Sequence, residues 1–146
     1  MLMHFDLVYV AEDAKLTTPF VNLALVPEAA SSWLLPSRIG YARAFAMFAL
    51  GEAVDGKTAA SIGIANMALP KDQVRAKALA SAKALATRPL GALQATKKLM
   101  RDAAAIQSVM NREAEIFGAR LKTAEAAEAF KAFAERRQPD FSKISG

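Results

Sequence analysis

Residues 4–36 read HFDLVYVAEDAKLTTPFVNLALVPEAASSWLLP, and this stretch decides the fold class. Its first part, residues 7–10, is a run of β-branched and aromatic residues, which predicts a short strand. Residues 16–18 predict a second short strand. From residue 29 the pattern becomes helical, and Pro36 is expected to end the first helix because the residue before a proline disfavours helical geometry. The stretch therefore predicts an α/β protein with few strands.

The rest of the chain continues this helical pattern. Asp55 and Thr123 are expected to cap two of the helices, because their side chains accept hydrogen bonds from free N–H groups. Helices are expected over residues 29–35, 41–50, 56–62, 71–87, 90–103, 106–121 and 124–137, with a short edge strand at 65–69. A few unpartnered strands followed by many helices are typical of the second half of a larger α/β unit. We expect the missing strands to come from residues before Met1 or from a partner chain.

The composition excludes several kinds of function. The 146 residues suffice for one domain and include no cysteine and one histidine, which excludes disulfides, a cysteine nucleophile and a multi-histidine metal site. The net charge of +5 comes from scattered basic residues, and no basic run with interleaved aromatics indicates nucleic-acid binding. Charged residues interrupt every apolar stretch, so no membrane span is expected. We therefore expect neither a nucleic acid, a membrane nor a metal as partner.

Four small polar groupings could carry chemistry, and each has a simpler structural interpretation. His4 and Asp6 lie two apart on a predicted strand, which favours a hydrogen-bonded pair near a sheet end over an acid/base pair. Ser31 and Ser32 lack a nucleophile turn, so we interpret them as hydroxyls that satisfy N–H groups at a helix start.

The other two groupings lie on predicted helices. Lys97 and Lys98 could meet a phosphate but fit a solvated helix face better. Glu113 and Glu115 are two residues apart on a helix and so do not share a face, which makes a carboxylate dyad improbable.

Glu28 is the remaining candidate, because it follows an uncharged segment and precedes Ala-Ala-Ser-Ser. At a helix start, its carboxylate has a structural role near the positive end of the helix dipole. In an apolar pocket it would instead be a usable base near neutral pH. Local sequence leaves both interpretations open.

The chain resembles the second half of the crotonase (enoyl-CoA hydratase/isomerase) superfamily. The resemblance rests on a co-linear set: the strand with Asp6, Leu16 to Pro19, Leu25-Val26-Pro27, Leu35-Pro36, Ile39-Gly40, Leu50-Gly51-Glu52, Ala59-Ala60, Gly63, Asn66 and the ending AFKAFAERRQPDF. It implies the C-terminal portion of a ββα spiral fold. Residues 1–70 would then be the end of the core with the active-site segment, and residues 71–146 a helical oligomerisation region.

The resemblance also implies which catalytic parts are present. The family's two oxyanion-hole N–H groups and one hydratase glutamate would lie before Met1. The second hydratase glutamate follows a proline that matches Pro19, and Phe20 occupies that position. Glu28 matches the single catalytic glutamate of the family's Δ3,Δ2-enoyl-CoA isomerases, in a similar PFxxLxxxPExxSS context.

The resemblance therefore implies an isomerase whose catalytic base is Glu28. Uncharged residues would line its site: Phe20, Val21, Leu23, Leu25 and Trp33. Arg136 would reach the nucleotide end of coenzyme A, with Lys97 and Lys98 as weaker candidates.

Further expectations follow from the family. These are an acyl-CoA thioester as substrate, no cofactor, a trimer-type homo-oligomer, a cytoplasmic location and a part in fatty acid β-oxidation. We expect the isolated chain to show little activity. Two alternatives stay open, a hydratase and a non-catalytic remnant that associates through its helices.

Overall fold

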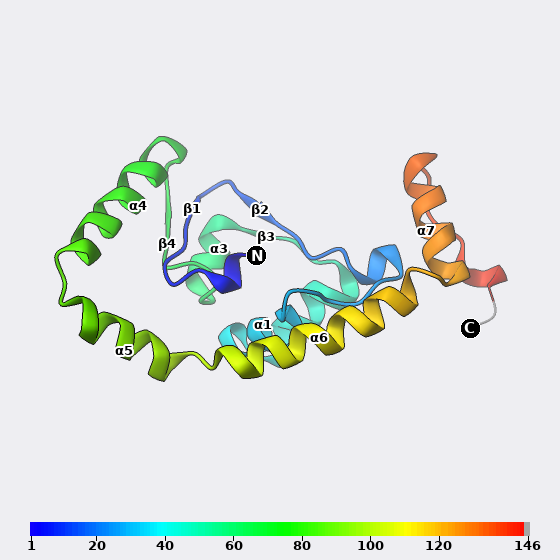
Figure 1. The fold of residues 1–146 in the computed structure, drawn as a ribbon. Helices are drawn as coiled ribbons and strands as arrows, with labels where there is room; N and C mark the ends of the chain where they lie inside the picture. Colours follow the sequence, from blue (N-terminus) through cyan, green and yellow to red (C-terminus); the bar gives the residue numbers. More distant parts are fainter. Residues whose placement is uncertain (145–146) are drawn as a thin grey trace. The chain divides into compact units, whose positions relative to one another are not determined.

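The computed structural model describes residues 1–144 and is drawn in Figure 1. The β-strands are β1 (Tyr9–Ala11), β2 (Lys15–Leu16), β3 (Val54–Asp55) and β4 (Met67–Leu69). The α-helices are α1 (Ser31–Ile39), α2 (Tyr41–Phe45), α3 (Gly56–Ser61), α4 (Lys71–Ala86), α5 (Leu90–Met100), α6 (Ala103–Arg120) and α7 (Ala124–Ala134). Short helical turns are η1 (Leu2–His4), η2 (Val21–Leu23), η3 (Ala46–Leu50) and η4 (Phe141–Lys143). Few short strands and many helices confirm the predicted fold class.

Contacts divide the chain into two compact units that are interleaved along the sequence. The first comprises residues 1–16 and 54–108, and the second residues 17–53 and 109–146. This division follows packing. The expected division of roles at residue 70 concerns function and stays a prediction.

In the first unit, β1 pairs in parallel with β4, the strand expected near residues 65–69 (Figure 1). Val8 and Val10 form a small buried cluster with Ala65. The Asn66 side-chain oxygen accepts a hydrogen bond from the Val8 N–H at 2.7 Å, which extends the pairing beyond the ladder.

Helix α3 begins where the sequence predicted. The Asp55 side chain accepts a hydrogen bond from the Thr58 N–H at 2.7 Å and caps the helix. The hydrogen bond from the Thr58 N–H also holds the pKa of Asp55 below its ordinary value. Gly56 follows directly, and a Cβ there would lie 1.8 Å from the Ala11 carbonyl oxygen. The close approach of the two backbones therefore requires glycine.

In the second unit, α1 runs through Pro36 instead of ending before it, so the predicted boundaries of 29–35 are wrong. Pro36 removes one hydrogen bond of the helix ladder. The helix nevertheless continues to bury Leu35 and Ile39, which are 4% and 3% exposed. Burial of Ile39, three residues beyond the proline, offsets part of this local penalty.

The helix predicted at 41–50 forms in two parts, α2 and the π-helical turn η3. Gly51 ends it in the left-handed conformation, as expected for a helix C-terminus. Met47 and Phe48 of η3 are buried, and the Phe48 ring packs against Phe20 with centroids 5.9 Å apart. The Thr18 hydroxyl donates to the Met47 carbonyl at 2.9 Å.

Helix α7 starts at the predicted cap, where Thr123 Oγ1 accepts a hydrogen bond from the Ala126 N–H. It ends at Ala134, three residues before the predicted end at 137, in a Schellman motif. The Arg136 N–H donates to Phe133 and the Arg137 N–H to Ala132, with Arg136 in the left-handed conformation. Arg136 thus lies beyond the helix on which it was expected.

Candidate active site

Glu28 lies in the loop between η2 and α1. Its side chain is exposed, and its carboxylate makes no polar contact with any residue among 1–144. Its own carbonyl oxygen accepts a hydrogen bond from the Ser31 N–H at 3.0 Å. The backbone of Glu28 is therefore held while its carboxylate stays free to react.

The two residues after Glu28 have an unusual backbone. Ala29 and Ala30 both have a φ of 56°, in the left-handed region. Each such residue other than glycine costs roughly 1–2 kcal/mol. Strain of this kind persists only where the surrounding structure enforces it, and it clusters at functional sites.

Here a carboxylate from α6, far away in the sequence, holds the strained backbone in place. Glu113 of α6 is 5% exposed. Its Oε2 accepts a hydrogen bond from the Ala30 N–H at 2.6 Å, and its Oε1 accepts one from the Ser32 N–H at 2.9 Å. Ala30 occupies the N-cap position of α1 and has no side chain that could cap the helix. Glu113 supplies that cap across the fold, where the positive end of the helix dipole favours a negative charge.

This role of Glu113 was not predicted from the sequence. A signal was present, because Glu113 repeats the helical spacing of Ile106, Met110 and Phe117, which are buried or half-buried. A carboxylate within an apolar stripe needs a buried partner. The expectation that Glu113 and Glu115 face different ways is confirmed, since Glu115 is exposed.

The serines do not satisfy the helix start as expected. Among the residues described, Ser31 Oγ is buried without a hydrogen-bond partner. The Ser32 N–H binds Glu113. The Glu113 carboxylate has taken the role that was predicted for the hydroxyls, because it reaches two N–H groups at once.

The expected apolar residues around Glu28 occupy different environments. Leu25 is 7% exposed, Phe20 and Leu23 are half-buried, and Val21 and Trp33 are 45% and 43% exposed. Within residues 1–144 they do not enclose the Glu28 carboxylate. Instead, Val21 and Leu25 line a pocket of about 370 Å³ together with Ala24, Arg120, Glu125 and Phe141.

One ion pair forms the polar wall of this pocket. Arg120 pairs with Glu125 and donates from Nε to the Ala24 carbonyl at 3.0 Å. The guanidinium thereby ties the end of η2 to the junction of α6 and α7. The pocket thus has an apolar surface with one fixed polar edge.

Of the basic residues expected as phosphate contacts, Arg136 belongs to the second unit and Lys97 and Lys98 to the first. Arg136 is exposed after α7. Lys97 forms an ion pair with Asp6 at 2.6 Å, and Lys98 is exposed.

The predicted placement of His4 and Asp6 on a strand is wrong. His4 lies in η1 and its Nδ1 contacts the Arg101 guanidinium at 3.0 Å, because the strand begins only at Tyr9.

Neither a membrane-spanning helix nor a metal-binding cluster is present among residues 1–144. No helix there has the length and apolar character needed to cross a membrane. No group of three or more histidine, cysteine or carboxylate side chains in that range could hold a metal ion. The fold and the site define an α/β protein in which an exposed carboxylate, that of Glu28, lies directly before a helix start capped by Glu113.

Comparison with known proteins places this chain in a family. Residues 1–144 match the family model for enoyl-CoA hydratase/isomerase. The chain is 32% identical to "Probable enoyl-CoA hydratase" of Bacillus subtilis, covering 90% of this chain and 52% of that protein. It is 27% identical to "Enoyl-CoA delta isomerase 2" of Rattus norvegicus, covering 91% of this chain and 34% of that protein.

A solved structure agrees with this placement. An enoyl-CoA hydratase/isomerase from Pseudoalteromonas atlantica superposes with a TM-score of 0.92 at 36% identity, covering 96% of this chain and 57% of that one.

The chain therefore belongs to the enoyl-CoA hydratase/isomerase family, and the expected crotonase fold is confirmed. It spans about half the length of the curated bacterial relatives that it matches first. Several of these relatives are named hydratases, and others are named isomerases. The names leave the reaction of this protein open.

Proposed function

We propose that this protein isomerises Δ3-enoyl-CoA thioesters to Δ2-enoyl-CoA thioesters, with Glu28 as its single acid–base residue. The observation that carries the proposal is the state of Glu28. Its carboxylate is exposed and free of polar partners among residues 1–144, while its backbone is held at a strained helix start. Among residues 1–144 the Glu28 carboxylate neither caps the helix start beside it nor pairs with a cation, the two structural roles open to an acid at this position.

The reaction needs one base that both accepts and returns a proton. The Glu28 carboxylate removes the acidic proton from C2 of the 3-enoyl thioester, and the electron pair delocalises to a dienolate. The neutral Glu28 carboxyl then returns the proton to C4, which moves the double bond from C3–C4 to C2–C3. N–H donors must stabilise the dienolate oxygen. The family resemblance places those donors outside residues 1–146.

Phe20 supports isomerisation over hydration. The resemblance places Phe20 at the position of a glutamate that activates water in hydratases. A phenyl ring cannot accept a proton, and this half-buried ring packs against the buried Phe48. Under the hydratase alternative neither glutamate of the hydratase catalytic pair would lie in this chain, because the resemblance places one before Met1 and Phe20 occupies the position of the other.

The proposed substrate binding combines the pocket and Arg136. The apolar wall formed by Val21 and Leu25 suits an acyl chain. Arg136 is an exposed cation that can reach the phosphates of coenzyme A. No cofactor is required, because the thioester itself acidifies the C2 proton.

Replacement of Glu28 tests the proposed function. The protein should be purified from the cell that produces it. The conversion of a 3-enoyl-CoA is then followed through the absorbance of the conjugated product. We expect Glu28→Gln to lower kcat by about 100- to 10,000-fold. Its melting temperature should be unchanged, because the carboxylate holds no partner among the residues described. Glu115→Gln, at another exposed acid, is the matched control.

Other outcomes identify the alternatives. Formation of 3-hydroxyacyl-CoA from a 2-enoyl-CoA, without conversion of the 3-enoyl-CoA, would make the protein a hydratase. Neither reaction, in a protein that still binds coenzyme A or a full-length relative, would support the non-catalytic alternative.

A further inference from the structure

We propose that Glu113 is a positioning residue for Glu28, a role that rests on the proposed function. Glu113 touches no reacting atom. It acts by fixing the backbone from which the catalytic carboxylate projects.

The hydrogen bonds of Glu113 enclose the turn that follows Glu28. Its two oxygens bind the N–H groups of Ala30 and Ser32 at 2.6 and 2.9 Å. The N–H between them, that of Ser31, donates to the carbonyl oxygen of Glu28. The Glu28 backbone is therefore linked to α6 through a single turn. The conformation of that turn sets the direction in which the Glu28 side chain points.

The side chains of Ala29, Ala30 and Ser31 supply no cap for this turn. Ala29 and Ala30 have methyl side chains and hold left-handed backbone conformations. Ser31 Oγ contributes no hydrogen bond within residues 1–144. Glu113 lies 83 residues from Ala30 and is nearly fully buried. Its burial limits its motion, so its position is set by the packing of α6.

The chemistry requires a carboxylate at position 113. Both partners are donors, and a carboxylate accepts through both of its oxygens. Glutamine would accept through one oxygen and direct its NH₂ group against the second N–H. Glu113→Gln therefore removes one hydrogen bond and adds a clash of donors, with almost no change in volume. Glu113→Asp keeps both acceptors and shortens their reach.

The test compares wild type, Glu113→Gln, Glu113→Asp and the exposed control Glu115→Gln in the protein as its own cell makes it. Hydrogen exchange by mass spectrometry reports on residues 28–33, and kinetics on a 3-enoyl-CoA gives kcat and KM. We expect exchange in this segment to accelerate by about 10-fold or more in Glu113→Gln. We expect kcat to fall by about 10- to 100-fold with KM nearly constant, because misplacement of a catalytic group slows the chemical step. Glu113→Asp should recover part of both losses.

Several results would overturn the proposal. One is exchange in residues 28–33 that is no faster in Glu113→Gln than in Glu115→Gln. Another is a lowered melting temperature with kcat of the folded fraction intact, which would mark Glu113 as structural only. If Glu113→Gln does not fold, hydrogen exchange in residues 28–33 and kcat are compared between Glu113→Asp and the wild type instead, and unchanged values of both overturn the proposal. If the wild type lacks isomerase activity, the proposed function fails, while the exchange measurement still decides whether Glu113 holds the turn.

Discussion

At the scale of single residues, Arg136 combines a strained backbone with a proposed binding role. Its φ is 54°, and it occupies the position of the Schellman motif that is usually glycine. We expect Arg136→Gly to raise the free energy of unfolding by up to about 1 kcal/mol, because glycine adopts this conformation without strain. Urea denaturation of the variant and the wild type measures this change.

The same substitution tests coenzyme A binding without damage to the helix end. Loss of the guanidinium should raise KM for the thioester while kcat stays constant, as expected for a contact remote from the reacting atoms. Arg136→Lys keeps the charge and should retain most of the affinity. An unchanged KM in Arg136→Gly would remove Arg136 from the binding site.

The two glutamates show what a sequence can reveal about single residues. Glu28 was found because an acid after an uncharged segment is conspicuous locally, and the family resemblance assigned its role. Glu113 was missed because its partners lie 83 and 81 residues away. No local rule connects a carboxylate in one helix to the first turn of another, so only the folded structure pairs them.

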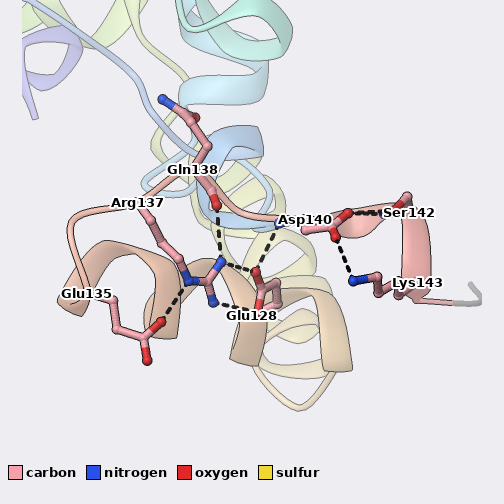
Figure 2. Close-up of polar contacts among 7 residues, drawn as sticks. All are labelled: Glu128, Glu135, Arg137, Gln138, Asp140, Ser142 and Lys143. Carbon is pink, nitrogen blue, oxygen red and sulfur yellow. Dashed lines mark hydrogen bonds and ion pairs between the residues drawn. The ribbon is translucent and has the colours of Figure 1, made fainter.

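At the scale of elements, a network of hydrogen bonds around the Glu128 carboxylate joins α7 to the segment that follows it. Figure 2 shows Arg137 between Glu128 and Glu135. Its NH1 and NH2 donate to the two oxygens of Glu128 at 2.5 and 3.0 Å. These hydrogen bonds, with one from the Asp140 N–H, lower the pKa of Glu128 from 4.5 to about 2.

This lowered pKa predicts a loss of stability in acid. A carboxyl whose pKa is lower in the folded state stabilises the fold above its unfolded pKa, and the gain disappears as pH falls through the folded value. We expect the melting temperature to fall between pH 4.5 and about 2, in the window set by the pKa of Glu128. In Glu128→Gln the fall should be shallower. Glu115→Gln is the control, and equal slopes in both variants would exclude the network as the cause.

Elements were predicted well where local chemistry sets them. The caps at Asp55 and Thr123 form as expected, because each needs only N–H groups within the next turn. The failure at Pro36 has a tertiary cause, since burial of Leu35 and Ile39 carries α1 past the proline. The strand boundaries shifted for the same kind of reason, because pairing with a distant segment decides where a strand begins.

At the scale of the whole molecule, the described chain leaves large apolar side chains in water. Leu90, Leu99 and Met100 of α5 are 65%, 90% and 83% exposed. These side chains are available for the subunit contacts that the expected homo-oligomer would need. Further chain or other copies of this chain can contact these side chains, and the expected homo-oligomer requires contact with other copies.

The last prediction concerns residues 1–146 in isolation. The proposed reaction needs N–H donors for the dienolate oxygen, and each missing donor costs on the order of 100-fold or more in kcat. The relatives are about twice as long as this chain, and the resemblance places the donors in the part it does not match. We therefore expect residues 1–146 alone to convert 3-enoyl-CoA at least about 100-fold more slowly than the protein as its own cell makes it. Intact mass spectrometry of that protein, compared with 15.6 kDa for residues 1–146, shows whether further chain is present. Comparable turnover by the isolated chain, abolished in Glu28→Gln, would show instead that residues 1–146 supply their own donors.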